Sequence, residues 1–172
     1  KSQTLFALDK AKTAIAKRDQ AIVVEGYFDA IALHAAGFDN AVASLGTAFT
    51  QGQIKQLLRY TDSKQIIFNF DADKAGIKAT NRALSEIEPL IYSGQVNVRI
   101  LNLPDGKDAD EFLLTENGIP AYQQALRDAP LWLDWQLENI LLGKDLTEAD
   151  HVQQTGKQII RLLAKIQDQT LA

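Results

Sequence analysis

Residues 65–73, Gln65-Ile66-Ile67-Phe68-Asn69-Phe70-Asp71-Ala72-Asp73, decide the fold. The first six are rich in β-branched and aromatic side chains, which is typical of a short strand buried on both faces of a sheet. The pair Asp71 and Asp73 follows the strand at once. Ligands of parallel α/β sheets bind beyond the carboxyl ends of the strands. The stretch therefore predicts a buried parallel strand with an acidic pair at its ligand-binding end.

Three more short apolar stretches lie at 21–24, 41–44 and 96–101. Helical patterns separate the four: an amphipathic helix over 4–17, one after Gly26, one opened by the Thr50-x-x-Gln53 capping box, and a long one from Lys74 to about Tyr92. Strands that alternate with helices predict an α/β fold, a parallel four-stranded sheet with helices on both faces and right-handed crossovers.

The chain after residue 104 shows only helical patterns, at 110–115, 121–127, 131–142 and 148–167. We expect Trp132, Trp135 and Leu141 in the core of these helices. In the last one, a single face carries four apolar residues: Val152, Ile159, Leu163 and Ile166. The prediction is an all-helical subdomain over 119–172, truncated, behind an α/β domain over 1–118.

Composition excludes several classes of protein. The 172 residues are 46% hydrophobic and 23% charged, as in a globular domain, and contain no cysteine and two histidines, which argues against zinc and thiol chemistry. No apolar run reaches the length of a membrane span, so we expect a cytoplasmic protein. The absence of methionine suggests a piece of a longer chain. Residues 104–150 hold three Lys or Arg against 11 Asp or Glu, which argues against a duplex clamp there.

Acidic residues follow three of the four predicted strands and should meet at one edge of the sheet: Glu25, Asp71, Asp73, Asp108 and Asp110. Crowded carboxylates destabilise a fold unless a cation neutralises them, and oxygen ligands favour Mg²⁺ or Mn²⁺. Such a centre suits phosphoryl or nucleotidyl transfer. Each acidic pair is also consistent with an ordinary helix N-terminus, where acidic side chains are favourable.

Other residues near this edge could contact phosphate. Gly46 and Thr47 could offer backbone N–H groups, although a turn that requires glycine explains them equally well. Lys74, Lys78 and Arg82 lie along the predicted long helix and could face phosphates, although a solvated helix face is the alternative.

Four stretches together resemble the TOPRIM core of bacterial replicative primases of the DnaG type. They are VVEGYFDA at 23–30, ASLGT at 43–47, DADKAG at 71–76 and LPDGKDAD at 103–110. The resemblance is firm over about 1–118 and looser over 119–172. It implies a TOPRIM-like sheet and a DNA-directed RNA polymerase that makes RNA primers on single-stranded DNA from nucleoside triphosphates during DNA replication.

The resemblance also implies a site. Glu25, Asp71 and Asp73 map onto the catalytic metal ligands, and Asp29, Asp108 and Asp110 map onto further acidic positions. Two or more Mg²⁺ or Mn²⁺ ions are expected, and no zinc in this chain. We expect this chain to lack the zinc module, much of the basic subdomain and the domain that binds the replicative helicase in the primosome. We therefore expect weak polymerisation by this chain alone.

Two alternatives stay open. A TOPRIM-type metal-dependent nuclease or a strand-breaking enzyme would use the same acidic residues, although no tyrosine here carries a flanking signature of a topoisomerase nucleophile. A non-catalytic module could instead bind nucleotides or dock a partner through the acidic helices. Nucleotide binding that ignores divalent metal would favour the latter.

Overall fold

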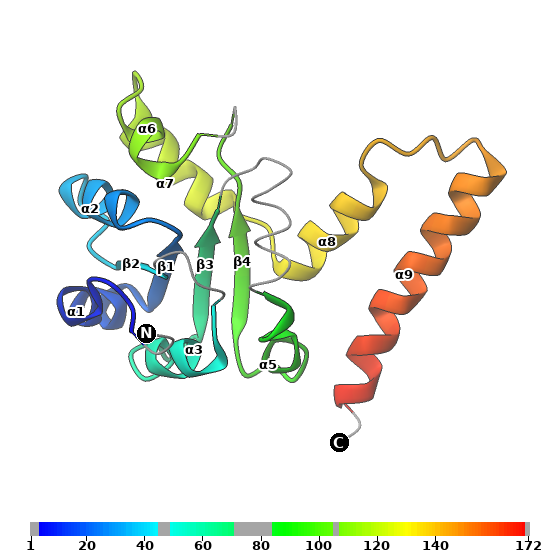
Figure 1. Cartoon of the computed structure of the whole chain (residues 1–172), viewed down its shortest axis with the longest axis horizontal. Helices are drawn as coiled ribbons and strands as arrows, with labels where there is room; N and C mark the ends of the chain where they lie inside the picture. The colour runs from blue at the N-terminus through cyan, green and yellow to red at the C-terminus, as the bar shows by residue number, and fades with distance from the viewer. Residues whose placement is uncertain (1–3, 45–48, 71–83, 105–106, 171–172) are drawn as a thin grey trace.

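The computed structural model describes residues 4–44, 49–70, 84–104 and 107–170, with side chains up to residue 166. Its strands are β1 (Gln20–Val24), β2 (Ala41–Ala43), β3 (Gln65–Asn69) and β4 (Asn97–Leu101). The described helices are α1 (Leu8–Arg18), α2 (Tyr27–Ala35), α3 (Gln51–Leu57), α5 (Glu88–Tyr92), α6 (Ala109–Leu113), α7 (Gly118–Asp128), α8 (Trp132–Leu141) and α9 (Ala149–Thr170). Figure 1 shows their arrangement around the sheet.

The four strands form one parallel sheet in the order β2-β1-β3-β4, which confirms the predicted fold class. Val24 pairs with Asn69, and Asn69 pairs with Leu101, so β1, β3 and β4 end in the same row. The residues that follow these three strands therefore lie at one edge of the sheet. In Figure 1, α6 lies at the end toward which β3 and β4 point, and α3 and α5 lie toward the other end.

Two hydrophobic cores cover the two faces of the sheet. One packs α1, α3, α5 and α8 against alternate strand residues such as Val23, Phe68 and Ile100. The other packs α2, α6 and α7 against the intervening residues, such as Ile22, Ile67 and Leu101. The side chains of a strand alternate between faces, so a strand buried on both sides has no polar side. This explains the nearly continuous apolar runs in the sequence.

The Thr50 capping box begins α3 as predicted: the Gln53 backbone N–H donates to Thr50 Oγ1 at 3.3 Å, and the Thr50 N–H donates to Gln53 Oε1 at 2.9 Å. The helix predicted to reach Tyr92 is interrupted. Its first part lies outside the described residues, a turn occupies 86–87, and α5 then begins with Pro89 in its first turn. Proline lacks the N–H that a helix interior needs, so it starts a helix more readily than it continues one.

The helices after α6 differ from the expected bundle. Tyr122 of α7 and Trp132 and Trp135 of α8 are buried against the sheet itself, whereas Leu141 is 41% exposed and does not join the core. On α9, Thr155 and Leu162 are buried, and the predicted Ile159 and Ile166 on the same side of the helix are partly buried.

Val152 and Leu163, predicted to lie on the apolar face of the last helix, are about half exposed. The helix contacts α5 and α8, and Lys165 forms an ion pair with Glu88 at 3.0 Å. No helix among the described residues is both long and apolar enough to cross a membrane.

Candidate metal centre

Asp29 lies in the first turn of α2, five residues after β1 ends. Its Oδ2 accepts a hydrogen bond from the backbone N–H of Gly26 at 3.2 Å, and its Oδ1 accepts one from the N–H of Asp110 at 3.4 Å. A Cβ on residue 26 would lie 2.9 Å from Asp29 Oδ2, so a larger residue there would require this carboxylate to shift. The carboxylate is thereby held between two elements that are 81 residues apart.

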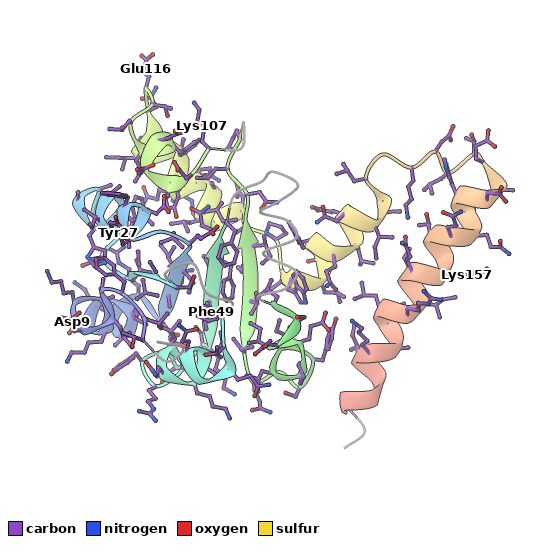
Figure 2. All side chains as sticks on the ribbon, in the orientation of Figure 1. Asp9, Tyr27, Phe49, Lys107, Glu116 and Lys157 are labelled. Carbon is purple, nitrogen blue, oxygen red and sulfur yellow. The ribbon has the colours of Figure 1, made fainter. Side chains whose placement is uncertain are left out.

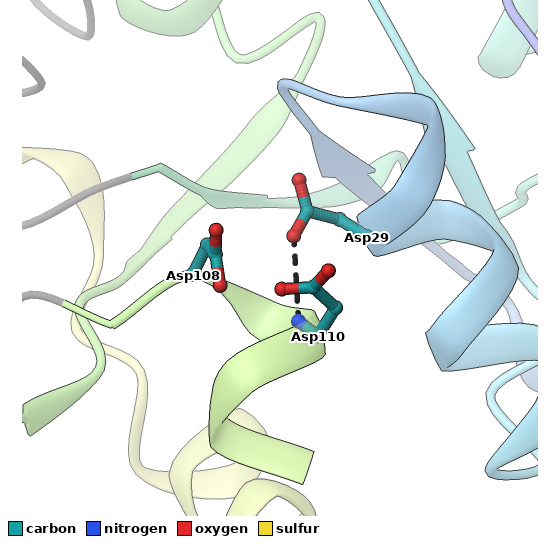
Figure 3. Close-up of side chains that lie close together, drawn as sticks. All are labelled: Asp29, Asp108 and Asp110. Atoms are coloured by element: carbon teal, nitrogen blue, oxygen red, sulfur yellow. Dashed lines mark hydrogen bonds between the residues drawn. The ribbon is translucent and has the colours of Figure 1, made fainter. Parts of the chain in front are cut away.

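Asp108 and Asp110 come from the start of α6. Asp108 is the N-cap, and its Oδ1 accepts a hydrogen bond from the Glu111 N–H at 3.1 Å. This cap fixes where the helix begins and turns Asp110, two residues on, toward α2. Figure 3 shows the Asp29 carboxylate, from α2, opposite the carboxylates of Asp108 and Asp110 at the start of α6.

Asp29, Asp108 and Asp110 each offer a carboxylate oxygen, and these oxygens lie within 4.8 Å of one another. Burial raises the pKa of the Asp29 carboxyl, and the charge of Asp108 adds to this, while the Gly26 and Asp110 N–H groups oppose it. A hydrogen bond with Asp108, together with burial and the negative charges of Asp108 and Asp29, raises the pKa of Asp110 to about 6. Without a cation, the Asp110 carboxyl therefore remains largely protonated at mildly acidic pH.

The residues fit a divalent cation by an observation independent of their charge. Asp110 Oδ1 is buried, and no hydrogen-bond donor among the described residues reaches it. A buried oxygen without a partner is costly, and a hard cation satisfies both this oxygen and the neighbouring charges. The acidic cluster is therefore consistent with divalent metal binding.

The remaining predicted site residues have different outcomes. Glu25 directly follows β1 at the same edge of the sheet, and its side chain is exposed. Asp71, Asp73, Gly46, Thr47, Lys74, Lys78 and Arg82 lie outside the described residues.

A buried polar pair behind this edge was missed by sequence reasoning. The Tyr122 hydroxyl donates to Asn69 Oδ1 at 2.9 Å, and Asn69 Nδ2 donates to the Leu101 carbonyl at 3.5 Å. Tyr122 is completely buried, and burial raises the pKa of its hydroxyl, with a contribution from the charge of Asp29. The pair ties α7 to the ends of β3 and β4. Its only sequence signal was Asn69, a polar residue inside an otherwise apolar strand.

Comparisons with known proteins agree with this architecture. Residues 22–113 match a family described as Toprim-like. DNA primase from Synechococcus elongatus is 56% identical over 96% of this chain, and DNA primase from Rickettsia felis is 37% identical over 99% of it. The chain spans about a quarter of the length of these curated relatives, 24% and 28% respectively.

Solved structures give the same result. A DNA primase domain from Pseudomonas aeruginosa superposes with a TM-score of 0.78 at 34% identity, covering 99% of this chain and 53% of that one. A DnaG primase catalytic domain bound to single-stranded DNA superposes with a TM-score of 0.79 at 30% identity, covering 95% of this chain and 50% of that one. The RNA polymerase domain of Mycobacterium tuberculosis DnaG bound to double-stranded DNA superposes with a TM-score of 0.78 at 32% identity, covering 99% of this chain and 53% of that one.

The sheet, its acidic edge and the family match define the class: this chain belongs to the Toprim-like family. Within that family it corresponds to the Toprim-containing part of the catalytic, RNA-polymerising domain of DnaG-type DNA primases.

Proposed function

We propose that this chain provides the metal-binding half of a primase active site, which joins ribonucleotides into a short RNA primer on a single-stranded DNA template. The observation that carries the proposal is the cluster of Asp29, Asp108 and Asp110, whose oxygens lie within 4.8 Å of one another at the carboxyl edge of the sheet. Two further facts support the proposal: Glu25 follows β1 at the same edge of the sheet, and the chain is similar to primase catalytic domains.

The acidic residues of this chain would have two roles in binding metal. Glu25, Asp71 and Asp73 are proposed as the catalytic metal ligands, with Asp29, Asp108 and Asp110 as ligands of a further ion or as its outer carboxylates. Two or more Mg²⁺ or Mn²⁺ ions held there would stabilise negative charge on the transferring phosphate and on the attacking and leaving oxygens. The Gly26 and Asp110 N–H groups keep Asp29 oriented before any ligand arrives.

Contacts with nucleotide phosphates are proposed for the phosphate-binding candidates Gly46, Thr47, Lys74, Lys78 and Arg82. Nucleoside triphosphates, template and primer are the proposed substrates. Binding of the replicative helicase through a separate C-terminal domain stays a prediction. The division at residue 118 also stays a prediction. The helices α7 and α8 both contribute core residues that pack on the sheet.

We test the proposal in a chimera, in which this chain replaces the matching segment of the Synechococcus elongatus primase. The assay is RNA primer synthesis on a single-stranded DNA template with Mg²⁺. The double variant Asp71→Asn with Asp73→Asn, and the single variant Asp108→Asn, remove carboxylates at nearly constant volume. The loss of several kcal/mol of charge stabilisation predicts a fall in rate of at least about a hundredfold.

The matched control is Glu116→Gln, at an exposed position in the loop after α6 that Figure 2 shows pointing into solvent. This variant should retain full synthesis, and all the variants should remain folded by circular dichroism. Undiminished synthesis in the folded Asp71→Asn, Asp73→Asn chimera would refute the proposed roles. Metal-dependent cleavage of single-stranded DNA without primer synthesis would identify a nuclease instead.

A further inference from the structure

Two aromatic side chains lie on the surface beside the acidic cluster. Of the aromatic residues that the structure describes, Tyr27 and Phe28 alone are exposed, with 47% and 63% of their surface accessible. Both belong to the first turn of α2, directly before Asp29 of the cluster. Single exposed apolar residues are ordinary, whereas neighbouring exposed rings form a patch of the kind that binds a partner.

The two rings form one continuous surface. Their centroids lie 4.4 Å apart, and the Tyr27 ring also contacts the Phe6 ring, with centroids 6.2 Å apart. The Phe6 backbone N–H in turn donates to the Ala43 carbonyl at 3.0 Å, which joins this segment to β2. Tyr27 is therefore supported from behind, and Phe28, the more exposed of the two, presents an accessible ring to solvent.

The geometry of α2 places Phe28 next to the metal centre. Successive residues of a helix are turned by about 100°, so Phe28 lies between Tyr27, which faces Phe6, and Asp29, which faces α6. Side chains of a helix also tilt toward its N-terminus, which here is the carboxyl edge of the sheet. The Cα atoms of neighbouring residues are about 3.8 Å apart. A single nucleotide can therefore reach both the ring and the acidic cluster.

We propose that Phe28, supported by Tyr27, stacks on the base of a nucleotide whose phosphates are bound through metal ions at the acidic cluster. This inference rests on the proposed function and deepens it. An aromatic ring stacks on any base, because every base has a flat face. A protein segment covering the rings would also desolvate the exposed carboxylate of Glu25, two residues before Tyr27, whereas a nucleotide with its metal ions brings positive charge to it.

Isothermal titration calorimetry in millimolar Mn²⁺ tests the inference with two ligands, ATP and ribose 5-triphosphate. They carry the same triphosphate and sugar, and only ATP has a base. The unmodified chain should bind ATP at least about fivefold more tightly, which is the lower end of the contribution of one stacked base. Titration with Mn²⁺ alone reports on the metal centre separately.

Three substitutions at the exposed ring separate stacking from apolar contact. Phe28→Ala should bind ATP and ribose 5-triphosphate equally, without weakening the latter, and Phe28→Leu should lose most of the preference for ATP although it stays apolar. Phe28→Trp should keep the preference, because its ring is flat and larger. The matched control is Leu142→Ala, which removes an exposed apolar side chain just after α8 and should bind both ligands as the unmodified chain does.

Asp108→Asn should weaken both ligands alike, because it acts on the phosphates through the metal. Equal affinity for the two ligands in the unmodified chain, or an undiminished preference in Phe28→Leu, would overturn the stacking while leaving the metal centre intact. Tight ATP binding that depends on Phe28 and not on Asp108 would instead separate the base site from the metal and overturn the link between them. Absence of Mn²⁺ binding would refute the proposed function itself.

Discussion

Replacing Asp110 with asparagine should stabilise the metal-free chain at neutral pH. Asp110 lies within 4.8 Å of carboxylate oxygens of both Asp29 and Asp108. At 4.8 Å, two unit charges repel by about 1 kcal/mol in water and by about 3.5 kcal/mol at an effective dielectric constant of about 20. The side chain is partly exposed, so the lower figure applies to each of the two pairs.

The expected gain in unfolding free energy is therefore about 2 kcal/mol, which for a chain of this length raises the Tm by about 4–8 °C. Scanning calorimetry at pH 7 in EDTA measures it, with Glu116→Gln as the control that should leave the Tm almost unchanged. With 10 mM Mg²⁺ the order should reverse, because a bound cation stabilises the native chain and needs the Asp110 carboxylate. A lower Tm for Asp110→Asn in EDTA would refute mutual repulsion in the cluster.

Three further predictions concern pH and packing. The pKa of Asp110 is raised from the ordinary 3.8 to about 6, so the stability that its protonated form gives the metal-free fold is fully present below the ordinary pKa and is lost as pH rises through 6. The Tm advantage of Asp110→Asn should therefore shrink as pH falls below 6 and vanish only below the ordinary pKa. Tyr122→Phe leaves Asn69 Oδ1 buried without its donor, so urea unfolding should show a loss of about 1–3 kcal/mol, and an unchanged midpoint would contradict the buried pair. Gly118→Ala places a Cβ 2.4 Å from the Phe112 carbonyl oxygen and should cost at least about 1 kcal/mol, whereas Gly52→Ala, inside α3 with no atom closer than 3.8 Å, should be neutral or stabilising.

The fold was largely predictable because the sheet is buried on both faces. Each strand is then a short apolar run, and the alternation of these runs with helices fixes a parallel sheet. The order β2-β1-β3-β4 was not predictable, because pairing depends on contacts between distant residues that leave no local pattern. Leu141 and the buried side of α9 were misjudged for a related reason. An apolar residue on a helix shows which side could be buried, and the neighbouring elements decide which side is.

The candidate site was only partly predictable. Acidic residues after β1 and β4 had to reach one edge, because parallel strands end together. Neither strand pattern nor spacing could show that the Asp110 N–H contacts Asp29, or that Asp110 Oδ1 would be buried without a partner. These depend on how α2 and α6 meet, which is a tertiary contact.

Anomalous diffraction from crystals of this chain soaked in Mn²⁺, with and without a nucleoside triphosphate, tests the central claim most directly. Mn²⁺ takes the same oxygen ligands as Mg²⁺ and is visible by its anomalous signal. The account predicts a peak bounded by Asp29, Asp108 and Asp110, or between them and Glu25, that is lost in crystals of Asp108→Asn. An empty acidic edge at millimolar Mn²⁺, with the carboxylates ordered, would contradict it.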